Sequence, residues 1–405
     1  MKQLWFAGNP GLYANANNYN GGGWISSLQH QLRLFCNRDL ELSVVFPWEN
    51  DIEETIDGYN YYGISRIHSP WYKYKTKMTN RNDRIKSIIK KERPDIILVF
   101  GTETYFGLVC TMTDIPVIIH IQGMLNAYYE TWLPQGVSWI RYLMAYPNPF
   151  KSFKTIIGSL ILKRSLKREI TMYKKCRYFF GRTHWDRSLV ELLSENAKYY
   201  YCNEIIRPEI YNSKKHWMIH SYETPKIVSI ISQAVYKGED VILRTAQLLK
   251  NYFSDNFEWN VYGINDISFW EKITSIKHKD SNVNIKGIIT ATELVDVICD
   301  ANVYVHPSYI ENSPNTVCEA QLLGIPVIAT NVGGISSLIR NNEDGLLVPA
   351  NDPYSMAAQI KKVLEDNIMA ERLGHKGRMV AMERHRPEKV CEEFMNSINK
   401  ILLER

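Results

Sequence analysis

The strongest constraint on the fold is an alternation of two hydrophobic periodicities in the second half of the chain. From residue 226 onward, short β-branched or apolar runs alternate with segments whose apolar residues follow a helical period. Strand, helix and strand at this spacing predict βαβ units in a parallel, doubly wound sheet. The predicted strands are residues 227–231, 257–263, 282–287, 301–307, 326–330 and 345–349. The predicted helices are residues 239–251, 266–277, 291–299, 314–323, 334–340 and 352–365.

The first half of the chain alternates less regularly, and the simplest organisation is two Rossmann-like α/β domains. Its predicted strands are residues 2–7, 41–46, 95–100, 116–121 and 176–181. A polar stretch with two prolines and no periodicity separates the halves. We therefore expect a first domain over residues 1–205, a linker over 206–225, a second domain over 226–385 and a terminal amphipathic helix over 386–405.

Length and composition agree with a folded protein of this size. At about 150 residues per domain, 405 residues suggest two domains or three small ones. With 45% hydrophobic and 22% charged residues, the chain differs from a disordered protein. The seven cysteines are scattered without a C-x-x-C pair, which predicts a reducing compartment and neither a disulfide framework nor a zinc ribbon. No apolar run approaches eighteen residues, so we expect neither a signal peptide nor a spanning helix.

Basic residues concentrate in the first half. Residues 1–203 carry 26 Lys and Arg against 17 Asp and Glu, a balance of +9, although the whole chain is only +5. The stretch 141–177 holds ten basic residues and one acid, Glu169, interleaved with aromatic and aliphatic side chains that include Phe153, Ile157 and Leu160. A solvated helix face is the simplest interpretation. The sharper hypothesis is binding to anionic lipid headgroups, and nucleic acid ranks third because no nucleic-acid motif accompanies the charge.

The stretch 306–335 carries the most specific local signals. Ser313 suits a helix N-cap, Pro314 the first helical position and Gly324 the left-handed position after the helix. The predicted helix starts just after a strand of the parallel sheet, where its free amides at Asn315 and Thr316 would suit an anion. Glu319 lies one turn later among apolar neighbours, and its carboxylate would suit paired hydroxyls such as a ribose diol. A surface or capping role is the alternative for Glu319.

At these residues the chain resembles a known family. Glu311 and Glu319 form an E-x7-E pair, and the whole stretch is similar to the signature of the retaining glycosyltransferases of family GT4, which have the GT-B fold. Four more segments extend the resemblance. In the second half they are residues 227–243, a strand and a loop with Lys-Gly, and the NDP at 351–353. In the first half they are the NGGGW loop at 20–24 and the strand at 117–123. GRTHWDR at 181–187 and CNEIIRPEIY at 202–211 resemble bacterial capsule and O-antigen members of the family.

The resemblance implies a role for each matching residue on the second domain. Glu319 would bind the nucleotide ribose and Lys237 would pair with the diphosphate. The backbone from Asn312 to Thr316, which includes Asn315, would hold sugar hydroxyls and phosphate. Glu311 would lie near the donor sugar.

On the first domain, Gly22 and Gly23 would let backbone approach the phosphates, since glycine has no Cβ, and His120 would face the transferred sugar. Where the family usually carries an arginine five residues before the lysine, this chain has Ser232. One phosphate contact would then be missing, or Arg182 or Arg207 would supply it.

The predicted activity is therefore that of a metal-independent, retaining glycosyltransferase. The donor would be a nucleotide-diphosphate sugar, UDP- or GDP-linked, and no other cofactor is expected because the chain has no D-x-D, G-x-G-x-x-G or Walker A motif. The acceptor would be a saccharide or polyprenyl-linked saccharide of surface-polysaccharide assembly. We expect a cytoplasmic protein, peripheral on the inner face of the membrane. The alternatives are a sugar-nucleotide epimerase or phosphorylase on the same fold, and an inactive sugar-nucleotide-binding subunit.

Overall fold

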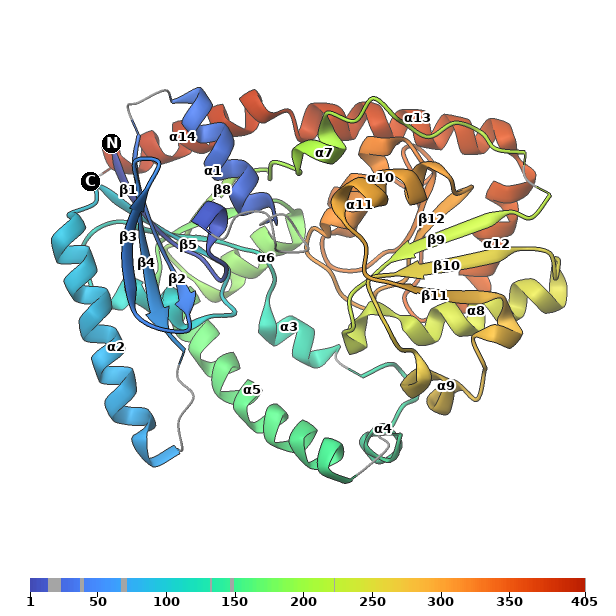
Figure 1. Ribbon diagram of the computed structural model, residues 1–405, viewed down its shortest axis with the longest axis horizontal. Helices are drawn as coiled ribbons and strands as arrows, with labels where there is room; N and C mark the ends of the chain where they lie inside the picture. The colour runs from blue at the N-terminus through green and yellow to red at the C-terminus, as the bar shows by residue number, and fades with distance from the viewer. Residues whose placement is uncertain are drawn as a thin grey trace.

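The computed structural model describes residues 1–13, 23–36, 40–66, 71–131, 133–145, 149–221 and 223–404, with backbone only for residues 71–77, 149, 151–157 and 159–161. Two α/β domains lie side by side, each with its own sheet (Figure 1). The predicted fold class of two parallel-sheet domains with a carboxyl-terminal helix is confirmed.

The first domain is built on an eight-stranded sheet in the order β3-β4-β2-β1-β5-β6-β7-β8. Neighbouring strands are parallel except β3 and β4, which form an antiparallel hairpin at one edge. Apolar clusters cover both faces of this sheet, which explains the near-continuous hydrophobic runs of its central strands. The strands are β1 (Lys2–Phe6), β2 (Glu41–Trp48), β3 (Ile52–Ile56), β4 (Tyr59–Ser65), β5 (Ile96–Phe100), β6 (Val117–His120), β7 (Tyr178–Gly181) and β8 (Lys198–Tyr201). Its helices are α1 (Gly23–Phe35), α2 (Trp71–Glu92), α3 (Leu125–Glu130), α5 (Pro149–Lys175) and α6 (His184–Leu193).

The second domain has a six-stranded, wholly parallel sheet in the order β11-β10-β9-β12-β13-β14. Its strands are β9 (Lys226–Ile230), β10 (Glu258–Tyr262), β11 (Val283–Gly287), β12 (Val303–His306), β13 (Val327–Thr330) and β14 (Leu346–Val348). Its helices are α7 (Pro208–Tyr211), α8 (Glu239–Tyr252), α9 (Ser268–Thr274), α10 (Ala291–Cys299), α11 (Asn315–Leu323), α12 (Pro353–Glu365) and α13 (Asn367–Arg384). Each strand predicted in this half is present.

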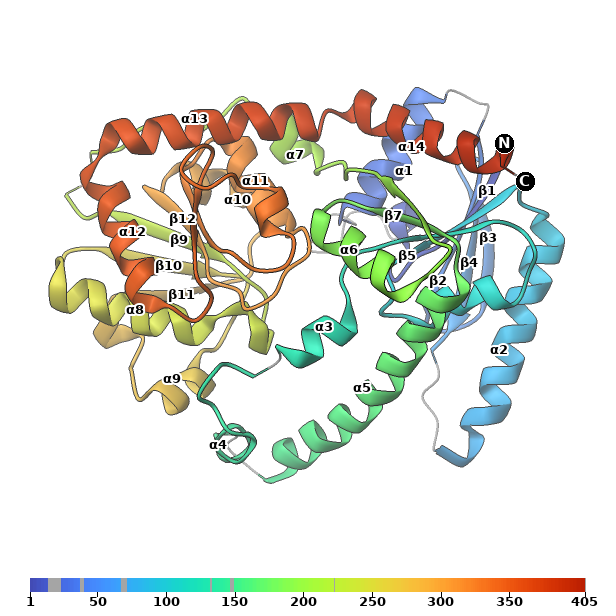
Figure 2. The ribbon, with the colours of Figure 1, turned by 180° about the vertical axis from the view of Figure 1, so that it is seen from behind.

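Two segments connect the domains away from the linker. Helix α14 (Pro387–Leu403) returns from α13 to the first domain, as Figures 1 and 2 show, and buries Val390, Phe394 and Ile398 in that domain's core. In the other direction, α4 (Trp139–Met144) belongs to the first half of the chain but lies beside α9. The Tyr142 ring packs on Phe269 with centroids 5.1 Å apart. The chain therefore crosses between the domains on both sides of the linker.

Three local predictions were wrong or incomplete. The predicted helix at 334–340 is only a 3₁₀ turn, Ile335–Ser337. Strands β3, β4 and β8 were not predicted. In β3 four of the five residues are exposed, and its two isoleucines stand only at its ends, so it lacks an apolar alternation. Helix α11 begins at Asn315 with Pro314 at its N-cap, whereas the sequence suggested Ser313 as the cap. The left-handed Gly324 after α11 is confirmed, with φ of +86°.

Candidate functional site: a polar cavity between the domains

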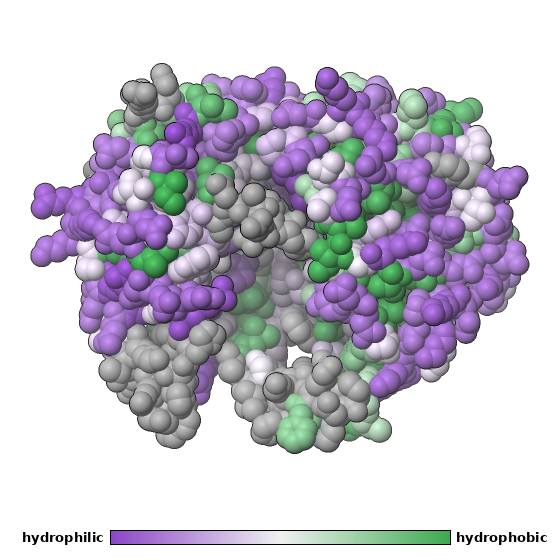
Figure 3. Space-filling model, viewed as in Figure 1, coloured by the Kyte–Doolittle hydropathy of each residue, from purple (hydrophilic) through white to green (hydrophobic). Residues whose placement is uncertain are grey.

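The domains meet over a cleft that is visible as a hollow between them in Figure 3. Within it lies a cavity of about 260 Å³. Both domains and the start of the linker region line this cavity. The lining includes Gly23, Trp24, Arg207, Ser232, Lys237, Asn315, Thr316 and Glu319. The cavity therefore contains most of the second-domain residues that were predicted to bind a nucleotide sugar.

Glu319 is the most unusual residue of this wall. It lies on α11 among buried apolar side chains and is 1% exposed. Arg207 Nε donates a hydrogen bond to Glu319 Oε1 at 2.7 Å, while Oε2 has no partner among the described residues. Burial raises the pKa of Glu319, and the neighbouring Arg207 only partly opposes that shift. A buried carboxylate oxygen of this kind, at a cavity wall and without a donor among the described residues, can accept a hydrogen bond from a hydroxyl group.

Lys237 and Glu311 form an ion pair at the second domain's side of the cleft. Lys237 Nζ lies 2.5 Å from Glu311 Oε1, and the same oxygen accepts from Ser308 Oγ at 2.8 Å and lies 3.0 Å from His306 Nε2. Although burial raises the pKa of Glu311, Lys237 and His306 hold it at about 2. The pKa of Lys237 is raised because Glu311 outweighs the effect of burial. Both groups are therefore charged at neutral pH, and Lys237 lines the cavity whereas Glu311 lies behind it.

Two glycines allow this part of the second domain to pack closely. Gly238 follows Lys237 with φ of +79°, and a Cβ there would collide with the carbonyl of Pro307. Gly333 has φ of +50°, and a Cβ there would collide with the carbonyl of Glu311. Only glycine avoids both the strain and the collision at these positions. The close approach fixes the loops that carry Lys237 and Glu311.

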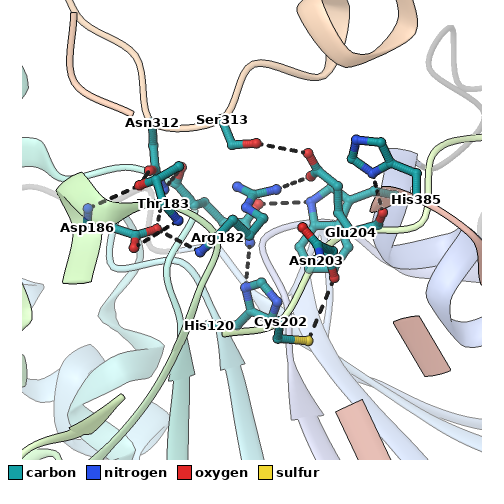
Figure 4. A network of polar contacts seen from close by, with 12 residues as sticks. His120, Arg182, Thr183, Asp186, Cys202, Asn203, Glu204, Asn312, Ser313 and His385 are labelled. Carbon is teal, nitrogen blue, oxygen red and sulfur yellow. Dashed lines mark hydrogen bonds and ion pairs between the residues drawn. The ribbon is translucent and has the colours of Figure 1, made fainter. Parts of the chain in front are cut away.

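Asn312 and Ser313 bind the first domain instead of the cavity. Figure 4 shows Asn312 between Thr183 and Asp186: Thr183 Oγ1 donates to Asn312 Oδ1 at 2.7 Å, and Asn312 Nδ2 donates to Asp186 Oδ2 at 3.0 Å. Ser313 Oγ donates to Glu204 Oε1 at 3.3 Å. These contacts explain the Asn-Ser-Pro sequence after Glu311, because its polar side chains join the two domains.

Arg182 is also part of this interdomain network. Its guanidinium pairs with Glu204, and both side chains are almost completely buried. Arg182 does not line the cavity, whereas Arg207 does. The side-chain geometry therefore favours Arg207 over Arg182 as the extra cation beside a bound nucleotide.

The first domain brings Gly23, Trp24 and His120 to its side of the cleft. Gly23 starts α1 with φ of +66° and lines the cavity, whereas Gly22 lies outside the described residues. His120 ends β6, is fully buried and does not line the cavity. Its ring contacts that of Trp24, with centroids 4.8 Å apart, and its Nε2 has no partner among the described residues. Burial and the charge of Arg182 hold the pKa of His120 well below its usual value, so the imidazole is neutral.

Sequence reasoning did not single out Trp24, Gly263, Thr290 or Leu294, which also line the cavity. Trp24 was quoted only as the end of a glycine-rich loop. Thr290 gives a local signal that could have drawn attention to this loop, because it forms a capping box with Glu293 at the start of α10. The other residues look like ordinary core or turn positions in the sequence.

Residues 212–380 match the profile of the family described as "Glycosyl transferases group 1". This part of the chain is similar to that family. The matched residues include Lys237, Glu311 and Glu319, and the predicted resemblance to bacterial polysaccharide glycosyltransferases is confirmed.

One curated relative of the chain is the capsular polysaccharide biosynthesis glycosyltransferase CapM of Staphylococcus aureus. The two are 32% identical over 123 residues, which is 30% of this chain and 32% of CapM. The chain spans between about a fifth and two fifths of the length of the first curated relatives it matches.

Solved structures resemble the whole chain. Sucrose-phosphate synthase from Thermosynechococcus elongatus has a TM-score of 0.75 at 15% identity, with all of both chains covered. HepE from Anabaena, solved in complex with UDP and glucose, has a TM-score of 0.66 at 12% identity and covers 99% of this chain and 100% of its own. These structural similarities show that the two domains around the cavity form a GT-B fold.

Proposed function

We propose that this protein is a retaining glycosyltransferase that moves a sugar from a nucleotide-diphosphate sugar to a saccharide acceptor in surface-polysaccharide biosynthesis. The observation that carries the proposal is the buried Glu319 with a free oxygen at the cavity wall. The group 1 family match and the capsular relative support the reaction class. UDP in the structurally similar HepE supports a UDP-linked donor.

In this proposal Glu319 accepts hydrogen bonds from the ribose hydroxyls, while Lys237, Arg207 and the first amides of α11 face the diphosphate. The bond between sugar C1 and the leaving phosphate oxygen breaks, and the bond between C1 and the acceptor oxygen forms on the same face. The leaving phosphate takes the proton of the acceptor hydroxyl. Lys237 and the positive end of α11 stabilise the negative charge that grows on the diphosphate in the transition state. Such electrostatic stabilisation is usually the largest single contribution to the rate enhancement.

His120, Gly22 and Gly23 are assigned to the first domain's side of the donor. The neutral imidazole of His120 can donate from one nitrogen and accept at the other. Its Nε2 would hydrogen-bond a hydroxyl of the transferred sugar once the ligand replaces the present packing. The Trp24 ring contacts His120 and lines the cavity, so it would move when the sugar reaches the imidazole.

A thermal-shift screen against UDP-, GDP- and other nucleotide sugars tests the proposal. A donor at about 100 times its dissociation constant should add about 2.7 kcal/mol to the free energy of unfolding. With that donor, nucleoside diphosphate should be released at a rate that rises when acceptor is added. A donor that binds and is converted without any acceptor would favour the epimerase, and binding without turnover would favour the inactive subunit.

The same turnover assay in excess EDTA tests metal independence. Lys237, Arg207 and the start of α11 offer positive charge to the diphosphate, and among the described residues no group of three His, Cys, Asp or Glu could hold a metal ion. We expect the rate to stay within about twofold of the untreated enzyme. Loss of turnover that Mg²⁺ or Mn²⁺ restores would contradict this part of the proposal.

We also propose that the protein binds an anionic membrane surface, where a polyprenyl-linked acceptor would be found. Lys163, Arg164 and Lys167 of α5 are exposed. Ile140 and Met144 of α4, the helix that precedes α5, are 72% and 78% exposed. Basic residues and exposed apolar side chains on consecutive helices suit an interfacial segment. The apolar stripe predicted at Phe153, Ile157 and Leu160 lies outside the described side chains. None of the helices that the structure describes is long and apolar enough to cross a membrane.

Liposome co-sedimentation with anionic and neutral lipid tests the membrane hypothesis. A variant with Lys163, Arg164 and Lys167 changed to Gln should bind anionic vesicles about 100-fold more weakly, since each charge near such a surface contributes about 1 kcal/mol. Arg168 is left unchanged because its Nη2 donates to the Glu103 carbonyl at 2.7 Å.

A matched control removes three exposed lysines of the second domain, Lys279, Lys286 and Lys376. The control should sediment like the wild type. Equal sedimentation of all three proteins on both lipids would leave the basic segment as a solvated surface.

A further inference from the structure

Glu103 is an exposed carboxylate in the segment after β5, and none of the roles above explains it. It follows β5 by three residues, at the edge of the sheet where His120 ends the adjacent parallel strand β6. Gly101 makes room for the Glu103 carboxylate: Gly101 has φ of +85°, and a Cβ there would collide with Glu103 Oε2. The same Cβ would lie 3.3 Å from Gln122 Cγ, and the amide of Gln122 lies 3.4 Å from His120 Nδ1. The chain therefore directs this carboxylate toward the His120 end of the sheet.

Two tyrosines connect Glu103 with the second domain's side of the cleft. The rings of Tyr128, on α3, and Tyr236, beside Lys237, have centroids 5.0 Å apart and are tilted by 38°. The charges of both Glu103 and Glu311 act on each of these tyrosines and raise their pKa values, in addition to the larger effect of burial. The packing agrees with this neighbourhood. Gly123 follows Gln122, and a Cβ on Gly123 would lie 3.0 Å from Tyr128 Oη, so Tyr128 lies against the segment that packs on Gly101.

Residue Glu103 is exposed to solvent, although many protein atoms surround its carboxylate. Burial and the charge of Glu169 raise its pKa to about 7, whereas a hydrogen bond from its own backbone N–H and the charge of Arg182 oppose the shift. No Lys or Arg side chain among the described residues forms an ion pair of 4 Å or less with the Glu103 carboxylate, unlike Glu311 and Glu319. The carboxylate is accordingly available to a ligand that donates hydrogen bonds.

We propose that Glu103 and the Tyr128–Tyr236 pair bind the acceptor saccharide. The Glu103 carboxylate accepts hydrogen bonds from acceptor hydroxyls, and the two aromatic rings offer an apolar surface to the sugar ring. A carboxylate beside aromatic faces suits a saccharide, because a sugar ring presents hydroxyl donors at its edge and C–H groups on its faces. This inference rests on the proposed function, and it adds to it three residues that would contact the acceptor.

Glu103→Gln separates acceptor binding from donor binding. The donor is the nucleotide sugar that the thermal-shift screen selects, and the acceptor probes are a panel of p-nitrophenyl α- and β-hexosides. We expect the acceptor KM of Glu103→Gln to rise at least tenfold, with the donor-dependent thermal shift unchanged. Glu195→Gln is the matched control, because Glu195 is exposed on the surface after α6, and it should behave like the wild type.

The pH dependence of the acceptor KM provides a readout that a merely structural role would not change. The ionised carboxylate is the better hydrogen-bond acceptor, so the wild-type KM should fall as pH rises through about 7, and Glu103→Gln should lose this dependence. The titratable or charged groups around the Glu103 carboxylate are those of Glu169, Arg182, Tyr128 and Tyr236. Arg182 stays protonated and the tyrosines stay neutral in this range.

The outcomes distinguish this inference from the proposed function. An unchanged acceptor KM in a folded Glu103→Gln with a normal donor shift would overturn the acceptor role of Glu103. If the wild type binds its donor but glycosylates none of the hexosides, the saccharide site is wrong as well. If no nucleotide sugar stabilises the wild type, the proposed function itself fails.

Discussion

Replacing Glu319 by Gln is expected to weaken nucleotide binding by about 10- to 150-fold while the protein stays folded. A hydrogen bond to a charged group contributes about 1.5–3 kcal/mol, and the neutral amide would lose that charge and one of the two acceptor oxygens. Titration of the wild type and the variant with the nucleoside diphosphate of the donor measures the effect.

The free protein should lose little stability through this change. Burial raises the pKa of Glu319, which means that the protein interior disfavours its charged form. The Arg207 side chain that loses its partner is 20% exposed and can be hydrated. Glu371→Gln on the exposed face of α13 serves as a control. Unchanged nucleotide affinity in a folded Glu319→Gln would show that this residue does not hold the ribose.

Replacing Lys237 by Ala is expected to lower kcat/KM by about 100- to 1000-fold. The ammonium group would face the diphosphate as negative charge grows on it, and removing one such contact costs on the order of 3–4 kcal/mol. The variant should also be less stable, by about 3–5 kcal/mol, because Glu311 is 4% exposed and would be left without its cation.

A second variant separates the two effects of Lys237. Lys237→Ala combined with Glu311→Gln removes the unpaired buried charge, so the free energy of unfolding should recover while turnover stays low. The acid dependence of stability should also shrink. In the wild type the pKa of Glu311 is depressed to about 2, so its stabilising effect is present above about pH 4 and is lost as the pH falls toward 2. Near-normal kcat/KM in either variant, measured beside Lys286→Ala as control, would return Lys237 to a purely structural role.

The regular part of the fold could be predicted because its signals are local. The strands of the second domain carry β-branched apolar runs, and α11 carries a proline at its start and a glycine at its end. The polar edge strand β3 has no such pattern, so it escaped prediction. The helix expected at 334–340 formed only a 3₁₀ turn, where Gly334 packs against the Asn312 carbonyl and Thr183 of the other domain. Contacts across the domains, rather than the local period, decide that segment.

The site residues also divide into those that local sequence signals predicted and those that only the folded structure placed. The residue types and spacing of the second domain already indicated Glu319, Lys237, Asn315 and Thr316, and these residues do share one cavity. The spacing could not say which arginine would join them. Arg182 is only 22 residues from its partner Glu204, and the folded chain buries that pair at the domain interface.

By itself, then, the sequence determined two parallel α/β domains and the helix that presents Glu319 to a ligand. Hydrophobic period, capping residues and glycine positions act within a few residues, so they can be recognised along the chain. Only the tertiary structure decided that Arg207 pairs with Glu319, which is 112 residues away, and that Lys237 pairs with Glu311, 74 residues away. It also brought the rings of Tyr128 and Tyr236, one from each domain, into contact. Such pairings arise because folding brings distant charges into one poorly hydrated cleft, where each group needs a partner or a ligand.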